Sequence, residues 1–256
     1  MCLALFALDA HPAFALVIAA NRDEYHARPA APAAWWEEGW LGGRDLAAGG
    51  AWLGVTREAR WALVTNVRDP SRNDPGAPSR GSLVPAALAD PAAPSQSLAR
   101  IVAAAAAHNG FNLVAGRGAE AHWGSNRTDA SRALAPGVYG LSNAALDTPW
   151  VKLTRTKAAL RAWCARGGED FAPLFAMLGD TDRAPDDLLP ATGIPRERER
   201  LLSAPFIVDD RYGTRCSTVL AIDREGRARF IERTFDPRGE LAGEVDYRFA
   251  VTNCNR

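Results

Sequence analysis

The sequence lacks a surplus of charge of either sign, because 30 lysines and arginines balance 30 aspartates and glutamates over 256 residues. Binders of nucleic acids or anionic membranes gain affinity from a basic surplus, so this balance argues against both classes of partner. The sequence also lacks any run of ~20 uncharged apolar residues, which argues against an integral membrane segment. Hydrophobic residues still make up 47% of the chain, which is enough for a buried core.

Cysteine and histidine are scarce and scattered. No two cysteines form a CxxC pair, and the four histidines show no metal-ligand spacing, so we expect neither a structural metal site nor a disulfide scaffold. Cysteine use of this kind fits a reducing compartment. The four cysteines are Cys2, Cys164, Cys216 and Cys254.

The first residues do not resemble a secretory signal. Residues 1–8 are apolar, but no basic segment precedes them, and Asp9 and His11 interrupt the run. We therefore expect a cytoplasmic protein.

Cys2 is the most informative residue of the chain. Removal of Met1 would leave a thiol and a free α-amine on one residue. An α-amine has a pKa of about 7.7–8.0, which suits a general base that activates an N-terminal nucleophile. The alternative is that Cys2 is an ordinary small residue at the start of a strand.

The apolar pattern predicts β-hairpins at both ends of the chain with helices between them. This order favours one α+β domain over residues 1–256, in which two antiparallel sheets pack together with helices outside. Residues 27–50 and 67–81 are interpreted as loops. Within the charged, proline-broken segment 179–205, the alternating Arg/Glu run at residues 196–200 is interpreted as a solvated face. The expected strands cover 3–8, 14–20, 51–56, 61–66, 111–115, 121–124, 138–142, 218–223, 228–235 and 247–251. The expected helices cover 83–88, 97–108, 149–166 and 171–178.

Several strand ends carry residues that could serve Cys2. An arginine stabilises a thiolate, and asparagine amides donate to a tetrahedral oxyanion. Individually, each such residue has a simpler role in a turn or on the surface. On an extended strand Arg22 and Glu24 share a face while Asp23 points away, so the acid that serves Cys2 stays open. The candidate catalytic residues are Cys2, Arg22, Asp23, Glu24, Asn66, Asn143 and Arg215.

An ordered set of short motifs resembles the NRDE family, the family of the transport and Golgi organisation two protein. The motifs extend from residue 1 to about residue 220, and together they are more specific than any one of them. They are Met1-Cys2, Asn21-Arg22-Asp23-Glu24, Gly43-Arg44-Asp45, Gly49-Gly50-Ala51-Trp52, Thr65-Asn66-Val67-Arg68, Ser79-Arg80-Gly81, Gly140-Leu141-Ser142-Asn143 and Tyr212-Gly213-Thr214-Arg215.

The resemblance implies a four-layer αββα sandwich like that of the N-terminal nucleophile (Ntn) hydrolases, similar to choloylglycine hydrolases and penicillin V acylases. It implies that Cys2 is the nucleophile, that Arg22 with Asp23 or Glu24 forms an Arg–acid pair, and that the two asparagines and Arg215 complete the site. Those hydrolases place the aspartate three residues after the arginine, where this chain has Tyr25. In this chain the acid instead lies directly after the arginine, as Asp23.

The segment around residues 35–61 holds five of the eight tryptophans. These rings either pack the core or form an aromatic wall for a large apolar ligand. Glycine-rich and Ser-Arg motifs nearby could hold a carboxylate or phosphate. The candidate ligand-binding residues are Trp52, Arg44, Gly49, Gly50, Ser79 and Arg80.

Two functions follow from these expectations. The first is an Ntn-type cysteine amidohydrolase that acts on a non-peptide amide with an apolar acyl group and requires no cofactor. The second, suggested by the family resemblance, is a carrier of haem or of an amphipathic acyl-CoA- or lipid-like ligand. Axial haem ligands could come from His11, His26 or Cys2, and the absence of a CxxCH motif argues against covalent haem. The oligomeric state stays open.

Overall fold

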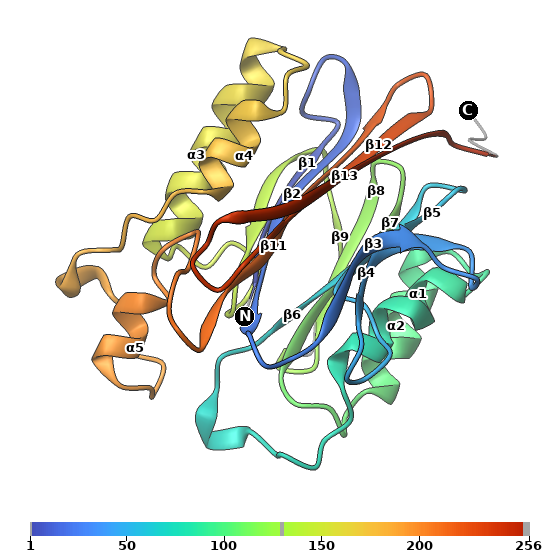
Figure 1. Cartoon of the computed structure of the whole chain (residues 1–256). Coiled ribbons are helices and arrows are strands. Elements are labelled where there is room, and N and C mark those ends of the chain that lie inside the picture. Colours follow the sequence, from blue (N-terminus) through green and yellow to red (C-terminus); the bar gives the residue numbers. More distant parts are fainter. Residues whose placement is uncertain (1, 129–130, 253–256) are drawn as a thin grey trace.

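The computed structural model describes residues 2–128 and 131–252, and it consists of two antiparallel sheets with helices on their outer faces (Figure 1). In spatial order, one sheet contains β10 (Gly137–Leu141), β1 (Cys2–Leu8), β2 (Phe14–Tyr25), β11 (Tyr212–Asp223), β12 (Arg227–Phe235) and β13 (Leu241–Ala250). The other contains β3 (Ala30–Trp35), β4 (Trp40–Asp45), β5 (Leu53–Thr56), β6 (Arg60–Asn66), β7 (Phe111–Arg117), β8 (Glu120–Ser125) and β9 (Arg132–Leu134).

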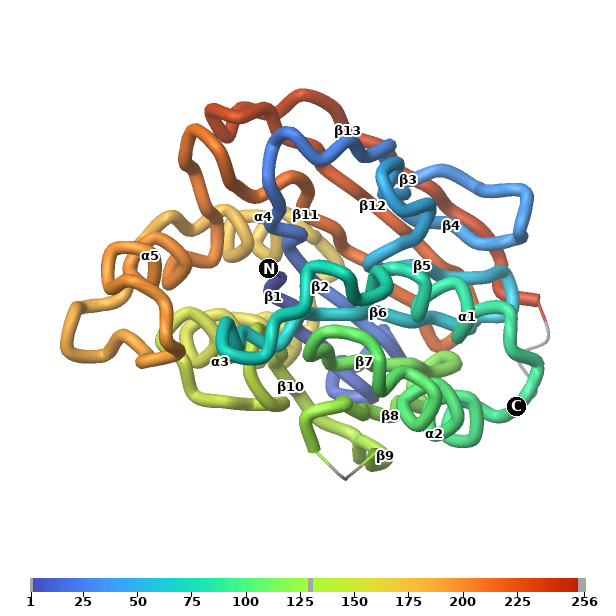
Figure 2. The backbone as a smooth tube through the Cα atoms, turned by 90° about the horizontal axis from the view of Figure 1, so that it is seen from below, coloured from blue at the N-terminus to red at the C-terminus, as the bar shows by residue number. Residues whose placement is uncertain are grey.

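The helices form the two outer layers. α1 (Leu83–Ala89) and α2 (Pro94–Ala104) cover the sheet that contains β6–β8, and α3 (Val151–Arg166) and α4 (Ala172–Leu178) cover the sheet that contains β1 and β2 (Figure 2). A shorter helix, α5 (Arg196–Leu201), lies in the connection to β11. This arrangement confirms the expected α+β sandwich.

The core lies between the sheets and continues under each helix pair. Alternate residues of a strand face opposite sides, so Phe6 of β1 stacks on Trp61 of β6 at 6.0 Å between ring centroids, inside the sandwich. Leu3 and Leu5 face the other way and pack with α3 and α4. Because β1 and the first part of β2 are buried on both faces, residues 3–8 and 14–20 form nearly continuous apolar runs.

The hairpins β1–β2, β5–β6 and β7–β8 confirm the sequence prediction. The prediction of a loop over residues 27–50 is wrong, because this segment forms β3 and β4. Proline cannot donate to a ladder and is confined to sheet edges and bulges; here Pro32 lies at a register shift between Ala31 and Ala34 in the edge strand β3. The short elements β9 and α5 were not predicted either.

The interpretation of the alternating Arg/Glu run at residues 196–200 as a solvated face fails at one residue. Glu199 of α5 is only 3% exposed, and its carboxylate pairs with Arg68 and accepts hydrogen bonds from Thr192. Local charge alternation could not show this, because the partner Arg68 follows β6, more than a hundred residues earlier.

Candidate functional site

One cross-strand row sets the geometry of the site. Arg22 of β2 lies directly opposite Cys2 of β1 on one side and Cys216 of β11 on the other. Side chains of residues paired in this way share a face of the sheet. All three line a cavity of about 510 Å³ at the end of the sandwich where β1 begins.

The cavity collects residues from both sheets and from the loop that precedes α1. Of the seven candidate catalytic residues, six line it: Cys2, Arg22, Asp23, Glu24, Asn66 and Arg215. Of the candidate ligand-binding residues, four line it: Trp52, Arg44, Ser79 and Arg80. The cavity is therefore where these separate sequence motifs meet.

Asp23 and Glu24 lie in different surroundings. The Asp23 carboxylate accepts a hydrogen bond from the Thr214 hydroxyl at 2.8 Å and lies in the electrostatic field of Lys152. Burial raises the pKa of Asp23, and the Lys152 charge and the Thr214 hydrogen bond limit that rise. The Glu24 carboxylate is partly exposed and accepts from the Tyr25 backbone N–H at 2.8 Å. The buried acid next to Cys2 is thus Asp23.

The Cys2 thiol is almost fully enclosed, with 8% of the residue exposed. Burial raises the pKa of Cys2, while the Arg22 guanidinium and the Asp23 backbone N–H act in the opposite direction. The Ser142 hydroxyl donates to the Cys2 carbonyl at 3.2 Å and so fixes the backbone at the start of β1.

We expect alkylation of Cys2 by iodoacetamide to accelerate steeply with pH while Met1 is present. The buried thiol has a raised pKa, so its thiolate fraction at pH 7 is small and grows about tenfold per pH unit. Peptide mass spectrometry after timed labelling between pH 6 and 10 measures this profile. A rate that levels off below pH 8 would contradict it.

The two asparagines have different positions. Asn66 ends β6 and lines the cavity. Asn143 is 1% exposed and does not line the cavity; its side-chain amide donates to the Asn66 carbonyl at 3.0 Å. Asn143 therefore holds the Asn66 backbone in place.

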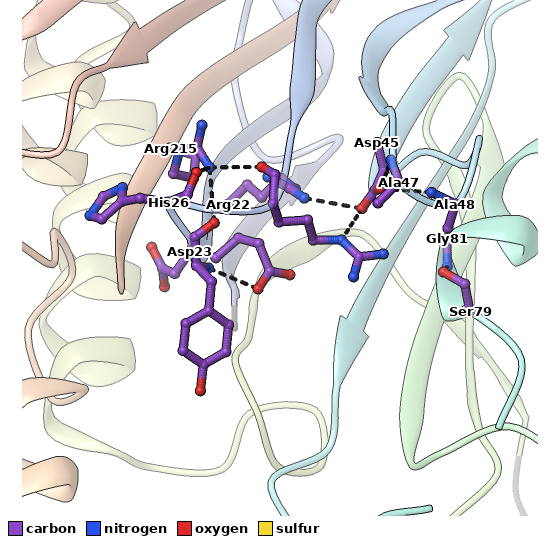
Figure 3. A network of polar contacts seen from close by, with 12 residues as sticks. Arg22, Asp23, His26, Asp45, Ala47, Ala48, Ser79, Gly81 and Arg215 are labelled. Atoms are coloured by element: carbon purple, nitrogen blue, oxygen red, sulfur yellow. Dashed lines mark hydrogen bonds and ion pairs between the residues drawn. The ribbon is translucent and has the colours of Figure 1, made fainter. Parts of the chain in front are cut away.

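Arg215 occupies a bulge in β11, where the pairing with β2 shifts between Thr214 and Cys216. An extra residue of this kind redirects a side chain. Here the Arg215 guanidinium donates to the backbone carbonyls of Tyr25, at 3.0 Å, and Arg28, at 3.1 Å (Figure 3). It therefore fixes the turn that follows β2.

Gly49 and Gly50 shape the β4–β5 connection and do not line the cavity. Gly49 has φ of 71°, a conformation that favours glycine. A Cβ on Gly50 would lie 2.4 Å from the Gly81 carbonyl carbon, so only glycine permits this approach. Arg44, by contrast, reaches the cavity and stacks over Trp36 at 4.8 Å.

The tryptophans do not form an aromatic wall. Among the described residues, Trp52 is the one tryptophan that lines the cavity. Trp40 and Trp61 are buried in the core, and Trp35 packs edge-on against Phe249. Most of the cluster therefore contributes to packing.

Several charged residues at or beside the cavity, among them Asp45, Lys152 and Glu232, were not predicted from the sequence. Asp45 pairs with Arg22 at 3.3 Å and with Arg28 at 2.5 Å. Lys152, at the start of α3, is 2% exposed, and burial lowers its pKa to about 8. Glu232 of β12 is buried at the cavity and accepts the Ala33 N–H at 2.7 Å. Asp45 alone lay within a recognised motif, so only it could have been found.

The expected histidine ligands of haem lie outside the cavity, and the described residues show neither a metal-ion site nor a membrane-spanning helix. His11 and His26 do not line the cavity; their rings contact the backbone carbonyls of Gly168 and Asp209. Within residues 2–128 and 131–252, no three His, Cys, Asp or Glu side chains are grouped to hold a metal ion. No helix in the same ranges is long and apolar enough to cross a membrane.

The chain resembles known proteins over nearly its whole length. The model of the family Transport and Golgi organisation 2 matches residues 1–237. The Transport and Golgi organization protein 2 homolog of Bos taurus is 37% identical, covering 91% of this chain and 93% of that protein. The human homolog is 32% identical, with 91% and 93% covered.

A solved structure shows the same fold at low sequence identity. The mutant C2A conjugated bile acid hydrolase from Clostridium perfringens superposes with a TM-score of 0.53 and 9% identity, covering 96% of this chain and 92% of that one. The chain therefore belongs to the Transport and Golgi organisation 2 family, and its fold is that of the Ntn hydrolases.

Proposed function

We propose that the protein is a cysteine amidohydrolase of the Ntn type, acting on a non-peptide amide with an apolar acyl group. The observation that carries the proposal is the position of Cys2 in the wall of the cavity, directly opposite Arg22. Trp52, Val64 and Phe235 line the same cavity and offer apolar surface to an acyl group.

The proposed reaction begins after removal of Met1. The freed α-amine of Cys2 takes the thiol proton, and the thiolate attacks the amide carbonyl carbon. The Asn66 side-chain amide is the candidate donor to the tetrahedral oxyanion, held in place through Asn143. The C–N bond then breaks, the proton passes to the leaving amine, and water hydrolyses the thioester to restore the thiol.

Arg22 is suited to the thiolate stage. Its guanidinium nitrogen Nη1 is buried with no hydrogen-bond acceptor among the described residues. A thiolate on Cys2 would place a negative charge beside this guanidinium. It would also accept a hydrogen bond from Nη1, whose burial without an acceptor costs free energy.

Intact mass spectrometry and acyl-enzyme trapping test the proposal together. We expect the purified protein to be lighter than the full sequence by one methionine. We also expect an acyl adduct on Cys2 when reactions with N-acyl amides are stopped with acid. Retention of Met1 would rule out the amine-base mechanism. A processed protein that no N-acyl amide acylates would rule out the hydrolase.

A second candidate function is the binding of haem or another amphipathic anion in the same cavity. Its support is that Arg80, Arg215 and Trp52 all line this cavity. Among the described lining residues, Cys2 and Cys216 are the side chains of a type that ligates haem iron. A haem titration without a Soret shift at micromolar protein would exclude this candidate.

A further inference from the structure

Asp45 connects the two sheets across the cavity. It ends β4 in one sheet, and its carboxylate reaches Arg22 of β2 in the other (Figure 3). The oxygen Oδ2 accepts from Arg22 Nη2 at 3.3 Å and from Arg28 Nε at 2.5 Å. The oxygen Oδ1 accepts the backbone N–H groups of Ala47 at 3.0 Å and Ala48 at 3.1 Å. Both carboxylate oxygens are therefore fixed.

The backbone around Asp45 is equally constrained. Its N–H donates to the Gly50 carbonyl at 2.9 Å, and its carbonyl accepts the Gly49 N–H at 2.8 Å. The positive φ of Gly49 lets the chain close this tight turn. The Leu46 N–H donates to the Pro29 carbonyl at 3.0 Å, which ties the turn to the segment after β2. A rigid turn thus presents a rigid carboxylate.

The charge of Asp45 is maintained at neutral pH. Burial would raise the pKa of Asp45, but hydrogen bonds from Arg28 and from the Ala48 N–H outweigh it and hold the pKa below its usual range. Within the described residues, Asp45 is the one carboxylate in ion-pair distance of Arg22. Asp23, although next to Arg22 in the chain, binds Thr214.

We infer that Asp45 is the positioning residue of the site. By binding Nη2 of the Arg22 guanidinium, Asp45 orients the other nitrogen, Nη1, toward the neighbouring Cys2. The inference rests on the proposed role of Cys2 as nucleophile. It also explains the departure from the hydrolase pattern in the second strand, since the carboxylate that pairs with the arginine comes from β4. Asp45 of the Gly-Arg-Asp motif and the Gly-Gly motif, which flank one turn, then serve to position Arg22.

The test compares Cys2 alkylation by iodoacetamide in the full-length wild type and in Asp45→Asn, across pH. We expect Asp45→Asn to slow alkylation about tenfold near neutral pH, corresponding to an apparent thiol pKa raised by roughly one unit. Simple removal of a negative charge would have the opposite sign, because it would leave Arg22 with more net positive charge near the thiolate. An unchanged or faster rate would therefore overturn the positioning role.

A second variant separates position from charge. Asp45→Glu keeps the charge but moves the carboxylate by one methylene, so a positioning role predicts slower alkylation here too, and wild-type rates in this variant would count against it. If either Asp45 variant fails to fold, Arg28→Gln, which leaves the 45–49 turn intact, is expected to slow alkylation about threefold, and no change would overturn the inference.

Asp90→Asn is the matched control, since Asp90 pairs with Arg100 and accepts the Ala92 N–H at 3.0 Å but does not line the cavity. We expect wild-type alkylation from this variant. Alkylation requires no amide hydrolysis, so the outcome stays readable if no amide substrate is found. Slower alkylation in Asp45→Asn, combined with no acyl-enzyme in the wild type, would support the positioning of Arg22 by Asp45. The same result would rule out the proposed hydrolase activity.

Discussion

Substitution of Cys2 by alanine is expected to reduce amide hydrolysis by at least about a thousandfold, because the proposed reaction has no other nucleophile. The Cys2 side chain lines the cavity, and backbone pairing with Arg22 holds the start of β1 to β2, so a smaller side chain leaves the strand and this pairing intact. The loss is measured as the rate at which the amine is released from the N-acyl amide that the wild type hydrolyses fastest. Melting temperatures within a few degrees of the wild type show that the fold persists.

Cys216→Ser supplies the matched control for this variant. Cys216 flanks Arg22 on its other side and lines the same cavity. Burial raises the pKa of Cys216 well above its usual range, and the nearby Glu232 carboxylate adds to the rise. Its thiolate is therefore not available near neutral pH, and we expect hydrolysis within about threefold of the wild type. Loss of activity in Cys216→Ser together with full activity in Cys2→Ala would show that Cys216, and not Cys2, is the nucleophile.

The sequence predicted the layers of the fold because its hairpins are local and its apolar runs are strong. The β1–β2 hairpin could be expected from two apolar runs and a short polar turn, but the pairing of Cys2 with Arg22 depends on a register that only the structure gives. The position of Arg215 was beyond sequence reasoning altogether, because it depends on a bulge in β11, nearly two hundred residues from β2.

Buried charges explain most of what the sequence could not show. Asp45, Lys152 and Glu199 each resemble ordinary surface residues in their local sequence, yet each is mostly enclosed, and their partners come from distant segments. A buried charge is tolerated only where tertiary structure supplies hydrogen bonds and opposite charges. Such residues become visible only when the two sheets and α3 are brought together.

Asn21 is expected to contribute more to stability than any other polar side chain of the second strand. It is completely buried, and its amide nitrogen donates to the carbonyls of Leu178, at 2.8 Å, and Pro205, at 2.9 Å. Its oxygen accepts the Ser217 hydroxyl at 2.6 Å. One side chain thus joins β2 to the end of α4, to the segment before β11 and to β11 itself.

Asn21→Ala should lower the free energy of unfolding by about 3–5 kcal/mol, because it leaves three buried polar groups without their partner at roughly 1–3 kcal/mol each. In a chain of this size the melting temperature should fall by roughly 10 °C. Asn109→Ala is the control: Asn109 also bridges two segments through the Asp74 backbone, but in exposed positions, and we expect a loss below about 1 kcal/mol. Urea titration followed by circular dichroism measures both variants.

The same variant separates the two roles of the Asn-Arg-Asp-Glu motif. Asn21 faces the helices while Arg22 faces the cavity, so Asn21→Ala should leave the rate of Cys2 alkylation within about twofold of the wild type well below its melting temperature. A melting temperature within 2–3 °C of the wild type, outside the range expected for three lost buried hydrogen bonds, would contradict the structural role. Strongly slowed alkylation in a fully folded variant would instead place Asn21 in the site, so that adjacent residues on opposite faces of β2 would no longer act independently.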